Sequence, residues 1–286
     1  MNQTIIDLYD RYTHGHITRR SFLDRLAALA GGTAAATALL PLLANNYARA
    51  ETVPESDSRI KVETVTTAGI STYVAKPAQG TSGGGDKFPT VVVIHENRGL
   101  NPHIKDVTRR FATEGYLAVG VDMLTPLGGT PADEEKAREM IGQLKPEEVA
   151  TQLTAIVAAA RARPDSNGKV GAVGFCWGGA AVNNLAVADP SLNAAVAYYG
   201  RQPSDDKVPA IKAPLLLHYA GIDENVNKGI QGYEAALKAN SKSYELHMYE
   251  GANHAFNNDT NEARYNKEAA DLAWSRTLDF LRRHLG

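Results

Sequence analysis

The residue types needed for acyl transfer, a thiol, a carboxylate and an imidazole, are spread along this 286-residue chain. The thiol belongs to Cys176, the sole cysteine, in the run Gly174-Phe-Cys-Trp-Gly178. A G-x-C-x-G turn between an apolar strand and a helix holds its central residue in a strained, exposed bend, with glycines where side chains would collide. The start of the helix favours the thiolate and a nearby oxyanion. The pattern therefore predicts a nucleophile, and the alternative is a small buried apolar residue.

A carboxylate and an imidazole follow later strands of the chain. Asp223 ends Gly221-Ile-Asp223, and His254 ends Gly251-Ala-Asn-His254. The order nucleophile, acid, histidine is that of the α/β-hydrolase fold. In it His254 serves as base and then acid, and Asp223 orients the imidazole. The backbone N–H groups of Trp177 and Asn97 are expected to receive the oxyanion. Taken singly, an Asp in a loop is more often a turn former or helix cap.

Strands and helices must alternate to bring these residues together. Apolar strands are predicted at 90–94, 116–121, 170–175, 194–199, 214–219 and 244–249, with helices between them and a last helix near the C-terminus. A hairpin is expected at 60–75, and a polar surface loop at 81–87. This alternation predicts an α/β fold with a mainly parallel sheet covered by helices on both faces. The carboxyl ends of the strands would then meet at one edge, where ligands bind.

The composition argues against several kinds of partner and cofactor. A formal charge of -2 gives no reason to expect nucleic acid or an acidic membrane surface as partner. One cysteine allows no internal disulfide. No His or carboxylate pair stands at ligand spacing with a third partner, so we expect neither a metal nor a cofactor.

Residues 1–50 have the composition of an export leader. Arg19 and Arg20 are followed by an uncharged stretch, 26–43, and then by Ala48-Arg-Ala50. The pattern resembles a twin-arginine signal with cleavage after Ala50, and an uncleaved membrane anchor is the alternative. We therefore expect residues 1–50 to stand outside the fold and residues 51–286 to form one domain. The protein would be exported already folded to the periplasm or beyond by the twin-arginine machinery.

Together, the motifs from about residue 58 onward resemble those of the dienelactone hydrolases (carboxymethylenebutenolidases). They are His95-Glu96 at the end of the first central strand, the Cys176 turn, Gly221-Ile-Asp223 and Gly251-Ala-Asn-His-Ala-Phe256. The resemblance implies a monomeric hydrolase that opens a lactone through an acyl-cysteine, with Cys176, Asp223 and His254 as triad. It also implies that Glu96 contacts the resting thiol and helps to deprotonate it.

The family members that act on dienelactone hold the substrate carboxylate with two arginines. Arg138 fits the first, and no arginine stands at 225–229 to match the second, where Lys228 is the nearest cation. Arg98 and Arg201 also follow strand ends, where each is either a substrate ligand in the same pocket or a solvated surface residue. We expect an exported hydrolase of a small ester or lactone. The alternatives are a broad esterase or peptidase on the same fold, and a binding protein that retains the fold without turnover.

Overall fold

The computed structural model describes residues 1–49, 51–78 and 87–286. Ala50, after which cleavage is predicted, lies outside the described residues, as does most of the polar loop predicted at 81–87.

The described residues form one eight-stranded sheet in the order β1-β2-β4-β3-β5-β6-β7-β8. Strands β3 to β8 run parallel, and β2 pairs antiparallel with both β1 and β4. The hairpin prediction is confirmed, because Ala68 and Gly69 turn the chain with φ of 50° and 81°. The strand bounds are β1 (Ile60–Thr67), β2 (Ile70–Pro77), β3 (Phe88–Ile94), β4 (Leu117–Val121), β5 (Ser166–Phe175), β6 (Ala194–Tyr198), β7 (Leu215–Ala220) and β8 (Tyr244–Tyr249).

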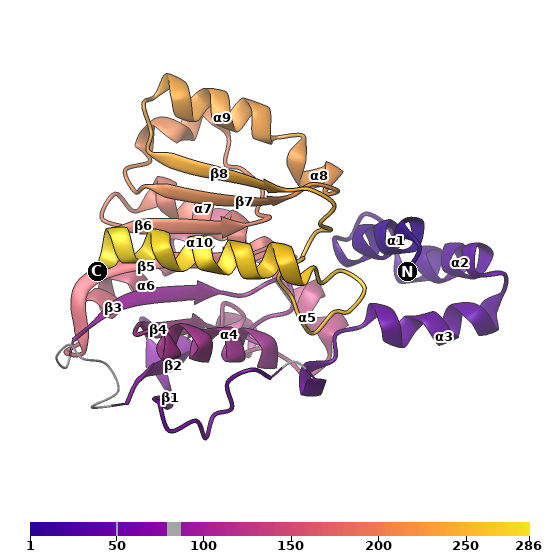
Figure 1. Ribbon diagram of the computed structural model, residues 1–286, viewed down its shortest axis with the longest axis horizontal. Coiled ribbons are helices and arrows are strands. Elements are labelled where there is room, and N and C mark those ends of the chain that lie inside the picture. Colours follow the sequence, from indigo (N-terminus) through magenta and orange to yellow (C-terminus); the bar gives the residue numbers. More distant parts are fainter. Residues whose placement is uncertain (50, 79–86) are drawn as a thin grey trace.

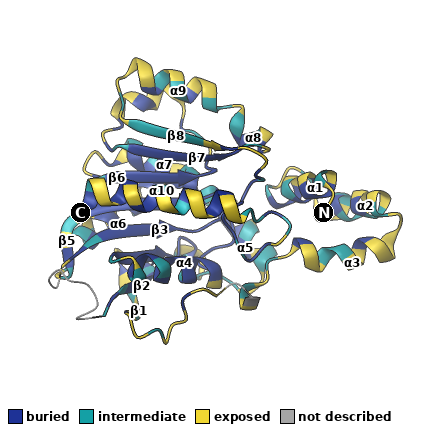
Figure 2. Cartoon of the chain, viewed as in Figure 1, coloured by how far each residue is buried: buried dark blue, intermediate teal, exposed yellow. Residues whose placement is uncertain are grey.

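Helices cover both faces of the sheet (Figure 1). One apolar core joins the sheet to α4 and α10, and a second joins the opposite face to α6, α7 and α9. The central strands are buried on both sides, as Figure 2 shows. The predicted α/β class with a mainly parallel sheet is therefore confirmed. These helices are α4 (Pro102–Thr113), α5 (Glu134–Ile141), α6 (Pro146–Arg161), α7 (Trp177–Ala188), α8 (Glu224–Asn227), α9 (Ile230–Ala239) and α10 (Lys267–Leu285).

The N-terminal segment, residues 1–49, is folded rather than set apart from the domain. It forms α1 (Gln3–Thr13), α2 (Arg19–Ala30) and α3 (Thr33–Leu43), beyond the carboxyl ends of the strands in Figure 1. Apolar residues of α1 pack on Phe22 and Leu26 of α2 in a separate small core. Among the described helices none is long and apolar enough to cross a membrane alone, and α2 with α3 passes that test only as a pair bent by 112°.

Candidate active site

Cys176 sits in the sharp bend that the sequence predicts. It follows β5, precedes α7, and has φ 56° and ψ -113°, a conformation that strains an L-residue. Its flanking glycines are required by close backbone contacts. A Cβ on Gly174 would lie 2.1 Å from the carbonyl oxygen of Gly178, and a Cβ on Gly178 would lie 2.4 Å from that of Ile94. The bend therefore depends on both glycines, as a nucleophile turn does.

His254 and Asp223 form the buried pair that the chain order predicts. Nδ1 of His254 lies 2.5 Å from Oδ2 of Asp223, and each residue is 5% exposed. Asp223 is held in turn, because its other oxygen accepts a hydrogen bond from Val226 N–H at 3.1 Å. Nε2 of His254 is buried and has no hydrogen-bond partner among the described residues. The imidazole is thus oriented at one nitrogen and free at the other.

Backbone strain is concentrated around this pair and the thiol. Besides Cys176, Tyr199 and Ala255 have positive φ, at 39° and 64°. Tyr199 follows β6 and packs on the His254 ring, and Ala255 directly follows His254. Strained residues of this kind persist where the surroundings fix them, and they are frequent at functional sites.

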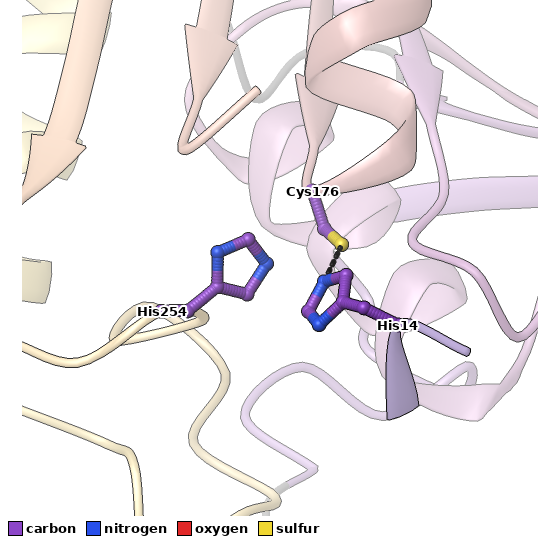
Figure 3. Close-up of side chains that lie close together, drawn as sticks. All are labelled: His14, Cys176 and His254. Atoms are coloured by element: carbon purple, nitrogen blue, oxygen red, sulfur yellow. Dashed lines mark hydrogen bonds between the residues drawn. The ribbon is translucent and has the colours of Figure 1, made fainter. Parts of the chain in front are cut away.

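The hydrogen-bond partner of the thiol is His14 from the N-terminal segment. Sγ of Cys176 lies 3.4 Å from Nε2 of His14, as Figure 3 shows, with the His254 ring beside them. The rings of His14 and His254 meet edge to face with centroids 4.6 Å apart. No role is predicted for His14 from the sequence. No local motif pointed to it, because it lies in a stretch with leader composition and meets the thiol only through the tertiary fold.

Charge around the thiol favours the thiolate. Burial raises the pKa of Cys176, but the imidazolium groups of His254 and His14 outweigh it and lower that pKa to about 6. Burial likewise lowers the pKa of His254, and the carboxylate of Asp223 and the thiolate together hold it well above its ordinary value. Both directions favour a thiolate at Cys176 beside an imidazolium at His254 near neutral pH.

The thiol opens onto a cavity of about 780 Å³. Cys176, His254 and the N-terminal segment all contribute to its wall. The lining residues are Thr13, His14, Gly15, His16, Ile17, Thr18, Arg19, Asn97, Glu135, Arg138, Glu139, Ile141, Gly142, Cys176, Trp177, Ala180, Tyr199, Arg201, Val226 and His254. A cavity of this size suits a small-molecule ligand.

The expected oxyanion donors border this cavity on two loops that touch. The described residues offer no hydrogen-bond acceptor to the N–H of Trp177 or of Asn97. His95 supports both loops, since its ring stacks on Trp177 at 5.2 Å. Its Nδ1 lies 2.6 Å from the Glu96 carbonyl oxygen, and its Nε2 lies 3.2 Å from Met123 N. Burial lowers the pKa of His95, so the ring is neutral, donating at Nδ1 and accepting at Nε2.

Glu96 lies at the end of β3 as predicted, but its hydrogen bond goes elsewhere. Oε2 accepts from the side-chain amide of Asn258 at 2.8 Å, and Oε1 is buried without a partner among the described residues. The contact with the resting thiol that the family resemblance implies is made by His14 in this structure.

The arginines proposed as substrate ligands have different surroundings. Arg138 lines the cavity, but its guanidinium binds the Tyr12 carbonyl and Glu135 and lies over the Tyr12 ring. Arg98 is buried away from the cavity lining and pairs with Glu134 at 2.9 Å. Both guanidinium groups are already paired, because residues of α1 and α5 bind them. Arg201 borders the cavity, and its guanidinium has no acceptor within the described residues. Of the three, it is the one available to a substrate.

Among the described residues, one group of side chains could hold a metal ion, and the spacing of its members in the sequence does not indicate it. The donor atoms of His14, Cys176 and His254 all lie within 4.8 Å of one another. Two imidazoles and a thiolate are ligands that Zn²⁺ accepts. Cys176 and His254 are also the predicted nucleophile and base, so an ion bound here would occupy the atoms that the predicted hydrolysis needs.

Comparison with known proteins agrees with this geometry. Residues 70–285 match the model of the dienelactone hydrolase family, and residues 1–31 match a second model described as YqhI-like. A protein of Methylorubrum extorquens assigned as a carboxymethylenebutenolidase is 31% identical over 230 residues, covering 75% of this chain and 77% of the relative. One of Saccharolobus solfataricus with the same assignment is 34% identical over 229 residues, covering 68% and 88%.

Solved structures extend the likeness to three dimensions. The crystal structure of a protein from Klebsiella pneumoniae assigned as a dienelactone hydrolase superposes with a TM-score of 0.70 and 28% identity, over 78% of this chain and 98% of that one. The family match covers strands β2 to β8, the Cys176 bend and the loops that carry Asp223 and His254, while β1 and the N-terminal segment lie outside it. The chain therefore belongs to the dienelactone hydrolase family, with the α/β-hydrolase fold, and is a hydrolase that acts on ester or lactone bonds.

Proposed function

We propose that this enzyme hydrolyses a small carboxylic ester or lactone through an acyl intermediate on Cys176. The observation that carries the proposal is a strained, cavity-facing thiol beside an imidazole that a buried carboxylate orients. Each part has a known use in acyl transfer: the bend presents the nucleophile, the imidazole moves protons, and the carboxylate fixes the ring.

The proposed reaction has two halves. In the first, the thiolate of Cys176 attacks the acyl carbon, and the N–H groups of Trp177 and Asn97 receive the oxyanion. The C–O bond then breaks, and His254 gives its Nε2 proton to the leaving oxygen. In the second, His254 takes a proton from water, the hydroxide adds to the thioester, and the C–S bond breaks to release the acid. The sum is one ester and one water converted into an acid and an alcohol.

The cavity supports a proposal for the substrate class. A volume of about 780 Å³ accommodates a small molecule. Arg201 at its wall would attract a carboxylate, so an ester or lactone that also carries an acid group is favoured. We propose a small acidic ester or lactone as substrate, and do not assign dienelactone itself.

The test is hydrolysis of dienelactone and of small activated esters by the purified full chain, beside Cys176→Ala. We expect the variant to lose at least a thousandfold in kcat/KM, since the acyl-enzyme route is then closed. Equal rates for the two proteins would reject the proposed mechanism.

We also propose that the enzyme is exported by the twin-arginine route and acts as a monomer in the periplasm or outside the cell. Arg19 and Arg20 support export, because both are exposed at the start of α2. Packing of α1 at the site favours retention of the leader over cleavage after Ala50. Export is tested by cell fractionation of the native chain and of the double variant Arg19→Lys, Arg20→Lys. The intact mass of the protein shows whether the leader is retained, and light scattering shows whether it is a monomer. An unchanged distribution of the double variant would refute the route.

A further inference from the structure

The side chain of His14 is oriented at Nδ1, as that of His254 is, but by a main-chain carbonyl with a carboxylate nearby. Its Nδ1 lies 2.8 Å from the carbonyl oxygen of Asp10 and 3.4 Å from the carboxylate Oδ1 of that residue. Arg264 lies 3.5 Å from the same carboxylate oxygen and forms an ion pair with it. The i,i+4 spacing puts Asp10 and His14 on one face of α1. With Nδ1 engaged, Nε2 is the nitrogen that faces the thiol.

Two imidazoles therefore converge on one sulfur. Sγ of Cys176 makes its hydrogen bond to His14 at 3.4 Å, and the donor atom of His254 lies within 4.8 Å of it. Figure 3 shows the sulfur directed toward His14. The Asp223 carboxylate accepts a hydrogen bond from His254, and Asp10 gives His14 a carbonyl acceptor and a carboxylate charge 3.4 Å away.

The charges facing His14 come from several elements. They are Cys176 at the bend, His254 after β8, Asp10 on α1, and His16 in the following turn, stacked at 6.4 Å. Burial lowers the pKa of His14, but the thiolate and the hydrogen bond to Asp10 outweigh it and raise that pKa to about 9. The Asp10 carboxylate stays ionised, because His254, His14 and Arg264 outweigh its burial and hold its pKa well below the ordinary range.

The N-terminal segment is attached to the loops that build the site. The Asn97 side chain donates to the Thr13 carbonyl at 2.8 Å, and Arg98 donates to the Tyr9 hydroxyl at 3.2 Å. Further along the segment, Asn46 N–H donates to the Thr260 carbonyl at 2.8 Å. Residues 13–19 form part of the cavity wall without closing it, since the thiol and His254 still line the open volume. The segment thus contributes to the pocket and does not plug it.

We propose that Asp10 and His14 are a second acid–base pair of the active site, in which His14 holds the Cys176 thiolate while His254 serves the leaving group and water. The proposal rests on the proposed function and assigns to the N-terminal segment a catalytic residue.

The protons balance. The S–H bond of Cys176 breaks, and the proton moves to Nε2 of His14, which keeps it as the cation paired with the thiolate. His254 enters the cycle protonated, gives that proton to the leaving oxygen, and regains one from the attacking water. When the C–S bond breaks, the returning thiolate meets the His14 cation again. His14 therefore changes the fraction of thiolate available and is not consumed in the cycle.

The experiment measures how the rate of Cys176 alkylation by iodoacetamide depends on pH in the full chain, together with the pH dependence of kcat/KM. The variants are His14→Gln and Asp10→Asn, with Arg11→Gln as a matched control on the exposed side of α1. For His14→Gln we expect the thiol midpoint to rise by about one unit, which lowers alkylation at pH 6 about fivefold. The acid limb of kcat/KM should move by the same amount. Asp10→Asn should move both in the same direction by less, and Arg11→Gln should leave them in place.

The outcomes separate the two proposals. An unchanged thiol midpoint in His14→Gln, with Cys176→Ala inactive, overturns the role of His14 alone. Activity in Cys176→Ala overturns the proposed function as well. Limited proteolysis of α1 shows whether a variant has released the segment. If His14→Gln releases the segment, Asp10→Asn is the deciding variant, because it keeps the His14 ring and its bond to the thiol. A rise of its thiol midpoint supports the role of His14, and an unchanged or lower midpoint overturns it.

Discussion

Gly178 is the position where the site depends most directly on the absence of a side chain. It is the second residue of α7 and is buried against the end of β3. A Cβ there would lie 2.4 Å from the carbonyl oxygens of both Ile94 and His95, where ordinary contact begins at 3.4 Å, an overlap of 1.0 Å. Both obstacles are backbone atoms, so no side-chain rotation relieves the clash. The change Gly178→Ala therefore forces α7 and the end of β3 apart.

The expected cost is worked from that overlap. Overpacking by one carbon costs about 1–3 kcal/mol, and with two rigid oxygens in the way we expect about 3 kcal/mol of unfolding free energy. The loop after His95 carries Asn97, so its N–H moves relative to Cys176. A displacement of about 1 Å in a catalytic group costs roughly a hundredfold in rate, and we expect a loss of that size in kcat/KM.

The assays are urea unfolding and hydrolysis of an activated ester. Gly232→Ala is the matched control, because Gly232 is exposed in α9 and the nearest atom to its Cβ would be Asp205 Oδ2 at 3.5 Å. Removing a helical glycine there should raise stability by about 0.5–1 kcal/mol without changing kcat/KM. A Gly178→Ala protein within about 0.5 kcal/mol of the native one, with its full rate, would refute the reasoning.

Other predictions concern charge and substrate. Asp223→Asn should lower kcat by about three orders of magnitude at neutral pH, because the His254 ring loses its orienting carboxylate. A loss below tenfold in steady-state kinetics would show that catalysis does not need this carboxylate. Because the pKa of Cys176 is about 6, kcat/KM on a neutral ester should fall about tenfold per pH unit below pH 6 and be level from pH 7 to 8. A kcat/KM profile with its midpoint near the ordinary thiol pKa would contradict a thiolate stabilised by the imidazoles. Arg201→Gln should raise KM about tenfold for esters bearing a carboxylate and leave neutral esters unaffected, and an equal effect on both would exclude a salt bridge to substrate. Glu96→Gln should cost about 1–3 kcal/mol in urea unfolding by disturbing the bond to Asn258, with less than a tenfold loss of kcat/KM; a thousandfold loss would instead support a direct role on the thiol.

Much of this site could be predicted from the sequence because its signals are local. The Cys176 bend is specified by glycines two residues away on either side, and the contacts at Gly174 and Gly178 give the reason. Asp223 and His254 follow predicted strands, and parallel strands bring their carboxyl ends to one edge. The α/β fold follows from the same alternation of buried strands and helices.

The packing of residues 1–49 at the site could not be predicted from the sequence. Their twin arginines and weakly apolar stretch resemble a leader, and that reading assigned no partner to His14. The contact of His14 with Cys176 joins residues 162 positions apart, and no local pattern encodes it. The same segment explains the arginines, since Arg138 binds the Tyr12 carbonyl and Arg98 the Tyr9 hydroxyl. Which cations remain for a substrate depends on tertiary contacts that single-sequence patterns do not reveal.

The acyl-enzyme itself is the most direct test of the account. The full chain would be mixed with a slowly hydrolysed activated ester, quenched in acid and digested, and the peptide containing Cys176 weighed by mass spectrometry. We predict one acyl group, bound as a thioester on that peptide and absent from Cys176→Ala. Rapid turnover with no label at Cys176, or a label on another residue, would contradict it.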